Sequence, residues 1–408
     1  MIDIVPLLVL LLLAVLVVVT ARRLHVPYTV ALVVLGFFIG ILSSAVGFSP
    51  LTKSEETLLA PGLFFNVLLP PIIFEAALHV NLTLLRRRAG LILSLAFAGV
   101  LFTTFFTGVL VSEFTSLSLI AALLLAAILS PTDPIAIVDL FRRLRVPEEL
   151  STIVESESLL NDAVGVLLFV VILQVLSTGS FSLAASAAQF VLLTVGGLAI
   201  GLVVAVAVYV LHRTIDEPSV ETAISVVAAY GSFLLANAVG ASGIIACAIA
   251  GIAVGSFVAP RAVAPESRQA IAVFWNVVVY IATSFIFLSI GLLFGLSHLL
   301  HYLGLIALVG VVMFFGRAAF VYAHRPLAGP GRRLPRSWYN VITFAGVRGA
   351  IPVVLALELL TSPPAGLSGS DVTAIVAGVL GVAFATILLG NFLADWYVKR
   401  AFSARPAD

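Results

Sequence analysis

The chain is poor in charge. Only 10% of its 408 residues are Asp, Glu, Lys or Arg, while 62% are hydrophobic. A soluble domain carries about a quarter charged residues and is about half apolar, so a single soluble core could not bury this much apolar surface. A lipid environment removes that difficulty. The shortage of charge therefore excludes an ordinary soluble domain and indicates a membrane protein.

Cysteine is almost absent, since Cys247 is the only one. One cysteine excludes a disulfide framework and a metal site built from thiolates. A strong excess of one charge is also missing, because the net charge is +1. The sequence therefore indicates neither nucleic acid nor an acidic partner. The apolar run that opens at Ile4 has no small-residue cleavage site, so we interpret it as the first span rather than a signal peptide.

Long apolar runs, by contrast, recur along the whole chain and are separated by short polar or Pro/Gly-bearing turns. Each run is long enough to cross a bilayer core as a helix. We therefore predict an all-α polytopic membrane protein with thirteen transmembrane helices. The predicted spans cover residues 4–20, 26–44, 58–80, 89–112, 117–141, 151–176, 186–211, 219–238, 242–259, 270–296, 300–323, 337–360 and 371–398.

The basic residues predict an orientation. With the N-terminus outside and the C-terminus cytoplasmic, 18 of the 21 Lys and Arg lie in predicted cytoplasmic segments, and only Lys53 lies in an outer loop. This bias follows the positive-inside rule and supports both the number of spans and their direction. The other two, Arg317 and Arg348, lie within spans. We expect Arg317 to pair with a carboxylate inside the protein, because an unpaired charge there is costly.

Two predicted spans contain helix breakers beside a charge. Span five reads S-P-T-D-P at Ser130–Pro134, around Asp133, and span twelve reads G-V-R-G-A at Gly346–Ala350, around Arg348. Backbone groups freed by such breaks are tolerated in a membrane only where they line a cavity. Interrupted spans in the two halves predict two inverted six-helix repeats whose broken helices cross. Prolines that merely kink their helices are the alternative, which the ionisable residue in each break disfavours.

Span six carries a polar cluster. Glu157, Ser158, Asn161 and Asp162 stand at positions i, i+1, i+4 and i+5, within an arc of roughly 140° on a helix. Asp162 follows the cytoplasmic end of the span by eleven residues, which is roughly 16 Å and close to the midplane of the bilayer core. Ionisable residues at that depth face a cavity or pair with one another. The cluster therefore predicts a functional site.

The chemistry of this cluster favours a small hard cation. Carboxylate, hydroxyl and carbonyl oxygens are the ligands that sodium prefers, and the cluster contains no imidazole or thiolate. Burial disfavours the anionic form of a carboxyl group, so Asp162 can hold either a proton or a cation. We expect Glu75, in span three, to line the same site. A carboxylate that holds one ion or the other is the minimum device for exchanging them.

The remaining polar residues of span six and of the two helix breaks can have structural roles instead of binding the ion. Glu157 and Arg348 are expected to form a buried ion pair that joins spans six and twelve. Asp133 and Asn161 are expected to satisfy unwound backbone rather than to hold the cation. Asp133 and Arg348 would also offset the partial charges of the half-helix ends. For Ser158, a role as ion ligand and a plain hydrogen bond between helices stay equally open.

These residues together resemble a known family. The segments S-P-T-D-P at Ser130–Pro134, E-S-L-L-N-D at Glu157–Asp162, F-E-A-A-L at Phe74–Leu78 and G-V-R-G-A at Gly346–Ala350 are similar to motifs of NhaP-type sodium/proton antiporters. That group belongs to the cation:proton antiporter family, which also contains the animal sodium/proton exchangers. Each motif alone is weak, but all four in this order and in matching spans are specific.

The resemblance implies an architecture and a set of roles. The whole chain, 1–408, would be one transporter unit, with a core domain at about 58–176 and 270–398 and a dimerisation domain at about 1–44 and 186–259. It would work as a homodimer in which the core moves in an elevator-like manner. The implied ligands of the proton or sodium ion are Asp162, Ser158, Glu75 and the main-chain carbonyl of Thr132; the implied site-stabilising residues are Asp133, Asn161, Glu157 and Arg348.

The resemblance also implies a function. We expect a secondary antiporter, not an enzyme, which exchanges sodium or lithium for protons across the cell membrane without a cofactor. Family members with Asn before the aspartate, here Asn161, resemble electroneutral one-for-one exchangers. A potassium/proton antiporter is the alternative within the class. An intramembrane aspartyl protease is disfavoured because no G-x-G-D motif occurs, and a channel because no filter sequence does. The expected partners are the ions, membrane lipids and a second copy of the chain, with no nucleic acid.

Overall fold

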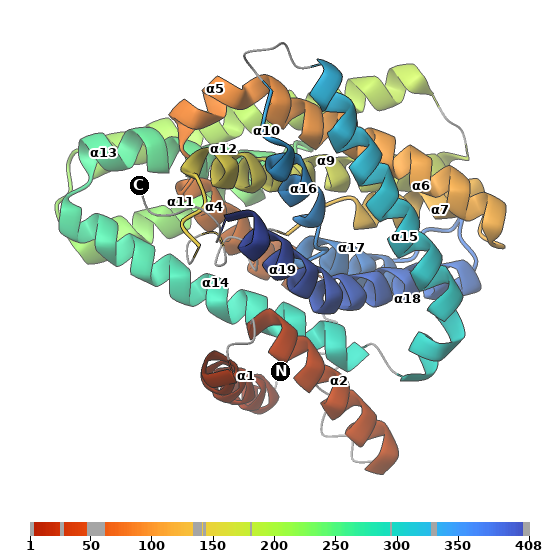
Figure 1. The fold of residues 1–408 in the computed structure, drawn as a ribbon. Helices are drawn as coiled ribbons and strands as arrows, with labels where there is room; N and C mark the ends of the chain where they lie inside the picture. Colours follow the sequence, from red (N-terminus) through yellow and green to blue (C-terminus); the bar gives the residue numbers. More distant parts are fainter. Residues whose placement is uncertain are drawn as a thin grey trace. The chain divides into compact units, whose positions relative to one another are not determined.

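The computed structural model describes residues 4–24, 28–46, 62–133, 141, 144–179, 182–293, 296–327 and 333–402. Throughout these residues the regular structure is helical, and no strand is present (Figure 1). The chain divides into two compact units. Unit 1 comprises Met1–Pro61, Ala89–Ser177 and Ser284–Asp408, and unit 2 comprises Gly62–Arg88 and Thr178–Thr283. The all-helical fold class predicted from the sequence is confirmed.

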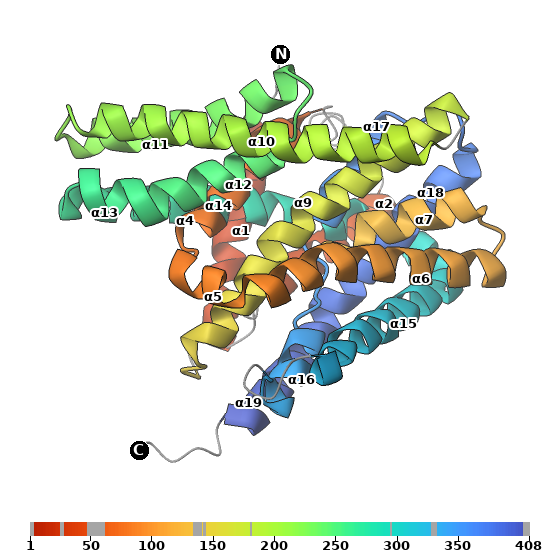
Figure 2. The same ribbon diagram turned by 90° about the horizontal axis from the view of Figure 1, so that it is seen from above.

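Unit 1 is built mainly from helices of the first and last thirds of the chain. They are α1 (Ile4–Leu24), α2 (Tyr28–Val46), η2 (Ser94–Gly99), α6 (Val100–Phe114), α7 (Leu119–Leu129), α9 (Glu148–Thr178), α15 (Leu296–Leu327), α16 (Arg336–Phe344), α17 (Ala350–Thr361), α18 (Gly369–Ala385), η4 (Thr386–Gly390) and α19 (Asn391–Phe402). Helix α6 packs between α7 and α15, and α18 packs on α7, α15 and α17. Figure 2 shows α6 and α15 running side by side. Far-separated segments therefore form one core.

Unit 2 is built around one central helix. Its elements are η1 (Leu63–Leu68), α4 (Leu69–Leu78), α10 (Leu183–His212), α11 (Pro218–Ala238), α12 (Gly243–Ala253), η3 (Val254–Val258) and α13 (Ala259–Ala262). Helix α12 packs against α4, α10 and α11. Glycines permit this packing: a Cβ at Gly201 would lie 2.5 Å from the Ala246 carbonyl oxygen. Two further helices, α5 (Leu82–Leu93) and α14 (Pro265–Leu293), contribute residues to both units.

The predicted spans correspond to helices of the structure. Eight helices in the described part of the chain are long and apolar enough to cross a membrane: 82–114, 148–178, 184–212, 218–238, 243–262, 265–292, 299–326 and 369–390. The other five predicted spans overlap shorter apolar helices at 11–21, 28–42, 63–78, 119–129 and 350–361. Residues 58–61 and 134–140 of the predicted spans lie outside the described residues. The multi-span membrane architecture is confirmed, whereas the count of thirteen crossings stays a prediction.

The two helix breaks are present where the sequence predicts them. Helix α7 ends at Leu129, and residues 130–133 are not helical. Helix α16 ends at Phe344, and α17 begins at Ala350. The two breaks meet, because the Asp133 backbone N–H donates to the Val347 carbonyl oxygen at 2.8 Å. Pro134, the second proline of the motif, lies outside the described residues. Proline and glycine thus interrupt both helices, and backbone groups of one break satisfy those of the other.

A glycine contact joins α2 to the C-terminal end of α14 within unit 1. A Cβ at Gly291 would lie 2.1 Å from the Val33 carbonyl oxygen. Small residues permit such close approach of membrane helices. We expect Gly291→Ala to force the two helices apart and to destabilise the protein by about 1–3 kcal/mol, as overpacking does.

Thermal unfolding in detergent would measure this effect as a lower Tm. Gly304→Ala is the matched control, because a Cβ at Gly304 meets nothing within 4 Å. Equal melting temperatures for the two variants would contradict the proposed close contact.

Candidate functional site

Helix α9 holds the polar cluster on one face, as its spacing predicts. Glu157, Ser158 and Asn161 are buried, with 2%, 3% and 0% of their surface exposed. Asp162, one residue further along, keeps partial exposure. A rotation of about 100° per residue separates the two neighbours. Asn161 therefore points into the protein, while Asp162 lies on a neighbouring part of the helix surface and is only partly buried.

Asn161 holds the break that follows α7. Its side-chain Nδ2 donates to Thr132 Oγ1 at 2.7 Å and to Glu157 Oε1 at 2.8 Å. Its Oδ1 accepts a hydrogen bond from the Thr132 backbone N–H at 3.2 Å. The amide thus uses both its donors and its acceptor, as a buried amide should. This agrees with the expectation that Asn161 satisfies unwound backbone.

Ser158 and Thr132 meet at the same place. The Ser158 hydroxyl donates a hydrogen bond to the Thr132 carbonyl oxygen, and both residues are buried. Two oxygens that are predicted to hold the cation are therefore neighbours. The same hydrogen bond is also what a purely structural role of Ser158 would require. The role of Ser158 as a cation ligand therefore stays a prediction.

Glu157 pairs with Arg317 and not with the expected partner. Arg317 Nη1 and Nη2 lie 3.0 and 2.9 Å from the two carboxylate oxygens of Glu157. Arg317 also donates to the Ile342 carbonyl oxygen through Nε and Nη2. The expectation that Arg317 pairs with a core carboxylate is confirmed. The predicted ion pair between Glu157 and Arg348 is wrong, because α15 brings Arg317 to Glu157 while the Arg348 guanidinium bonds to carbonyl groups.

Arg348 caps the end of α7. Its Nη1 donates to the Ser130 and Pro131 carbonyl oxygens at 2.9 and 3.1 Å. Carbonyls at a helix C-terminus lack partners and carry partial negative charge, so a guanidinium is well placed there. The Arg348 backbone N–H donates to Thr386 Oγ1 at 3.1 Å. Sequence reasoning missed Thr386, which carries no local signal for this role.

Asp133 lies beside the start of α17. A Cβ at Gly349, the residue before that helix, would lie 1.9 Å from Asp133 Oδ2. Only glycine leaves room for the carboxylate here. The N-terminus of a helix carries partial positive charge that favours an anion. The Asp133 carboxylate therefore lies at the N-terminus of α17, which carries partial positive charge. The Arg348 guanidinium lies at the C-terminus of α7, which carries partial negative charge. Both positions agree with the sequence-based prediction.

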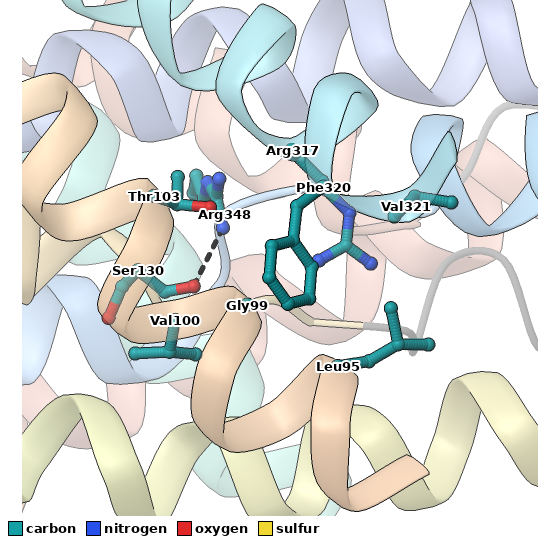
Figure 3. Close-up of a pocket in the computed structure, with 9 residues that line it drawn as sticks. All are labelled: Leu95, Gly99, Val100, Thr103, Ser130, Arg317, Phe320, Val321 and Arg348. Atoms are coloured by element: carbon teal, nitrogen blue, oxygen red, sulfur yellow. Dashed lines mark hydrogen bonds between the residues drawn. The ribbon is translucent and has the colours of Figure 1, made fainter. Parts of the chain in front are cut away.

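A small cavity of about 20 Å³ adjoins these residues. It is lined by Leu95, Gly99, Val100, Thr103, Ser130, Arg317, Phe320, Val321 and Arg348. Figure 3 shows Arg348 directed towards Ser130 and joined to it by a hydrogen bond, with the Phe320 ring to the right of this bond. Such a volume fits about one water molecule. Thr103, which lines this cavity, was not predicted from the sequence; its hydroxyl within an apolar span was the only sign of it.

Glu75 belongs to unit 2, where it lies on α4 and is half-buried. Its Oε1 lies 3.4 Å from Nδ1 of His79, one helical turn further on. Its predicted place beside Asp162 stays a prediction. Among the described residues, no group of three or more His, Cys, Asp and Glu could hold a metal ion. A cation at the α9 cluster would therefore also depend on hydroxyl and carbonyl oxygens.

Broken membrane helices that meet beside buried carboxylate and guanidinium groups define a class of protein, the secondary transporters. The comparison with known families agrees with this class. The family described as sodium/hydrogen exchanger, transmembrane, matches residues 8–400. The chain therefore belongs to the sodium/hydrogen exchanger family. Its members are transporters, so the expectation that the protein is not an enzyme agrees with the family.

Individual relatives support the assignment. The chain is 30% identical to the Na⁺/H⁺ antiporter ApNhaP of Aphanothece halophytica, over 92% of this chain and 70% of that protein. It is also 30% identical to the Na⁺/H⁺ antiporter NhaP of Pseudomonas aeruginosa, over 91% and 92%. Its fold resembles the sodium proton antiporter MjNhaP1 of Methanocaldococcus jannaschii, with a TM-score of 0.84, 24% identity and coverage of 98% and 99%. The predicted resemblance to NhaP-type proteins is thereby confirmed.

Proposed function

We propose that this protein exchanges sodium or lithium for protons across the cell membrane, with Asp162 as the group that carries either ion. The observation that carries this proposal is the contrast on α9 between buried, hydrogen-bonded Asn161 and partly exposed Asp162. A partly buried carboxylate next to a rigid polar cluster can bind and release a small cation. The relatives named as Na⁺/H⁺ antiporters support the choice of ions.

The charges of the cluster favour one-for-one exchange. Three carboxylates, those of Asp133, Glu157 and Asp162, accompany the two guanidiniums of Arg317 and Arg348. Glu157 is neutralised by Arg317, and Asp133 lies beside a helix N-terminus. One negative charge is then left, at Asp162. A single proton or a single sodium ion neutralises it, so each transport cycle would move no net charge as long as Glu75 keeps the same charge throughout the cycle.

The proposed cation site combines Asp162 with neighbouring oxygens. Its members would be the Asp162 carboxylate, the Ser158 hydroxyl and the Thr132 carbonyl, with Glu75 contributed by α4. Hard cations select such oxygen donors. Asp133, Asn161, Glu157 and Arg348 would keep these oxygens in place.

We further propose movement of the predicted core (58–176 and 270–398) against the predicted dimerisation domain (1–44 and 186–259). Arg317 of α15 bonds to Glu157 of α9 and to Ile342 of α16, and Arg348 bonds to the end of α7, so separate stretches of the predicted core are joined. Helices that are joined by such buried hydrogen bonds would move together as one rigid body. The working form would be a homodimer in the plasma membrane, with the N-terminus outside and the C-terminus cytoplasmic.

The direct test is transport by the purified protein in lipid vesicles. A pH gradient is imposed, a pH-sensitive dye is enclosed, and sodium, lithium or potassium is added outside. We expect sodium and lithium to dissipate the gradient. Dissipation by potassium alone would instead assign a potassium/proton antiporter. If no cation dissipates the gradient at any pH, the proposal fails.

Asn161→Asp tests the charge count. An aspartate cannot donate to Thr132 and Glu157 as Asn161 Nδ2 does, and its carboxylate would face Glu157 at hydrogen-bond distance. We therefore expect lower stability and loss of transport, and not a gain of charge-moving exchange.

Transport under an imposed membrane potential, together with the Tm in detergent, would check this result. Asn237→Asp is a matched control, because Asn237 acts as an acceptor, from the Gly243 N–H at 3.0 Å, and a carboxylate keeps that bond. A stable Asn161→Asp protein whose rate follows the potential would disprove the charge count.

A further inference from the structure

A second pair of titratable side chains is buried in unit 2. His212 ends α10, and Glu221 lies in the first turn of α11. His212 Nδ1 and Glu221 Oε1 are 3.2 Å apart, and 0% and 1% of the two side chains are exposed. The pair closes the corner between the two helices. It is separate from the cluster on α9, which belongs to unit 1.

Each member of the pair has one polar atom without a partner. Among the described residues, His212 Nε2 and Glu221 Oε2 are buried and make no hydrogen bond. Buried polar atoms are nearly always satisfied, and exceptions call for an explanation. If the only role of the pair were to hold the two helices together, residues with no unbonded polar atom would be more stable at these positions. Holding the corner together therefore does not explain the unbonded nitrogen and oxygen.

We propose that His212 and Glu221 form a second proton-binding site, which holds one proton and couples the α10–α11 corner to pH. With one proton the pair has no net charge, whether as imidazolium and carboxylate or as imidazole and carboxylic acid. Gain or loss of a proton puts a net charge into a buried position, which is costly without a partner. The corner can avoid that charge only by opening to water.

Charged groups on the surrounding elements do not supply a buried partner. Helix α11 packs on α4, α10 and α12, α10 also packs on η3, and Trp275 of α14 donates to Ser225 of α11. The titratable or charged groups of these elements and of the connecting turn are Glu75, His79, Tyr209, Arg213, Asp216, Glu217, Tyr230, Cys247, Arg261, Glu266, Arg268 and Tyr280. Of these described residues only the Cys247 thiol is buried, and it lies close to the Pro70 carbonyl oxygen, at 3.4 Å.

Histidine is the side chain that ordinarily changes charge near physiological pH. Gain or loss of the proton held by the pair should therefore change how well the backbone amides of the corner are protected against hydrogen exchange. This protection should depend on pH. Hydrogen exchange detected by mass spectrometry, on the whole protein in lipid nanodiscs from about pH 5 to about pH 9, would measure it after correction for the intrinsic exchange rate. We expect protection of peptides from residues 209–221 to change at least tenfold across this range.

The variant His212→Gln/Glu221→Gln keeps polar side chains of similar size but cannot titrate. We expect its corner to show protection that is independent of pH. His301→Gln is the matched control, because His301 is an exposed histidine of unit 1, and it should keep the wild-type response. A flat wild-type profile, or an unchanged transition in the double variant, would overturn the proposal.

A second measurement does not depend on the double variant. In protein labelled with ¹⁵N-histidine, the ring signal of His212 should titrate differently after Glu221→Gln, while the His301 signal should not change. Identical titration of His212 with and without Glu221 would also refute the site. Neither measurement uses transport, so the proposal can fail or stand independently of the proposed exchange function.

Discussion

Asp162→Asn is expected to reduce cation-driven dissipation of a pH gradient to the level of protein-free vesicles. The amide has the shape of the carboxylate but cannot hold a proton or neutralise a sodium ion. Since Asp162 is partly exposed, the substitution leaves the buried hydrogen bonds of Asn161 and Glu157 in place. The variant should therefore fold with a Tm near that of the wild type. The vesicle assay with the enclosed dye would measure the loss of exchange.

Binding can be checked without transport. A ligand that binds only the folded protein raises its stability in proportion to the logarithm of its concentration. Sodium should raise the Tm of the wild type, and the rise should shrink at low pH because protons compete for the same carboxylate. In Asp162→Asn the rise should vanish. Glu113→Gln, which changes an exposed carboxylate on α6, should behave as wild type; an undiminished sodium effect in Asp162→Asn would remove Asp162 from the site.

The second large effect is expected at the ion pair between Glu157 and Arg317. The two side chains are 2% and 12% exposed, so each neutralises the other away from water. Glu157→Gln would leave the guanidinium without its counter-charge. Breaking a buried pair in this way costs about 3–5 kcal/mol. We expect a Tm lower than that of any surface variant, together with loss of exchange because the Thr132 and Asn161 positions would no longer be held.

A double variant separates charge from packing. Replacing both partners with apolar residues of similar size, as in Glu157→Leu/Arg317→Met, removes the uncompensated charge, and such replacements are often neutral. Its Tm should lie above that of Glu157→Gln. Arg336→Gln, at an exposed arginine, is the control and should change stability by no more than about 0.5 kcal/mol. If Glu157→Gln melts with the wild type, the pair does not stabilise the cluster.

Much of the candidate site was predictable because its determinants are local. Prolines and glycines beside Asp133 and Arg348 predicted the two helix breaks, since these residues act on their own backbone. The spacing of Glu157, Ser158, Asn161 and Asp162 predicted a shared helix face, because that depends only on the geometry of one helix. The apolar runs predicted the helices in the same way.

Local pattern could not identify partners that are distant in the sequence. Arg317 and Arg348 both stood within spans, and either was chemically suited to Glu157. The sequence favoured Arg348, whereas packing of α15 places Arg317 there and leaves Arg348 at the end of α7. The division of the chain into two compact units has the same origin, since residues 62–88 group with 178–283 through packing.

The sequence by itself determined that the chain is a helical membrane protein, where its helices break, and which face of α9 is polar. Each of these follows from the periodicity and backbone preferences of short segments. Only the tertiary structure decided that Arg317 neutralises Glu157, that all hydrogen-bonding atoms of the Asn161 amide are used while Asp162 stays partly exposed, and that His212 and Glu221 are buried together. These features depend on which helices pack against one another. Packing brings together residues that are far apart in the sequence, and no local sequence pattern identifies such partners.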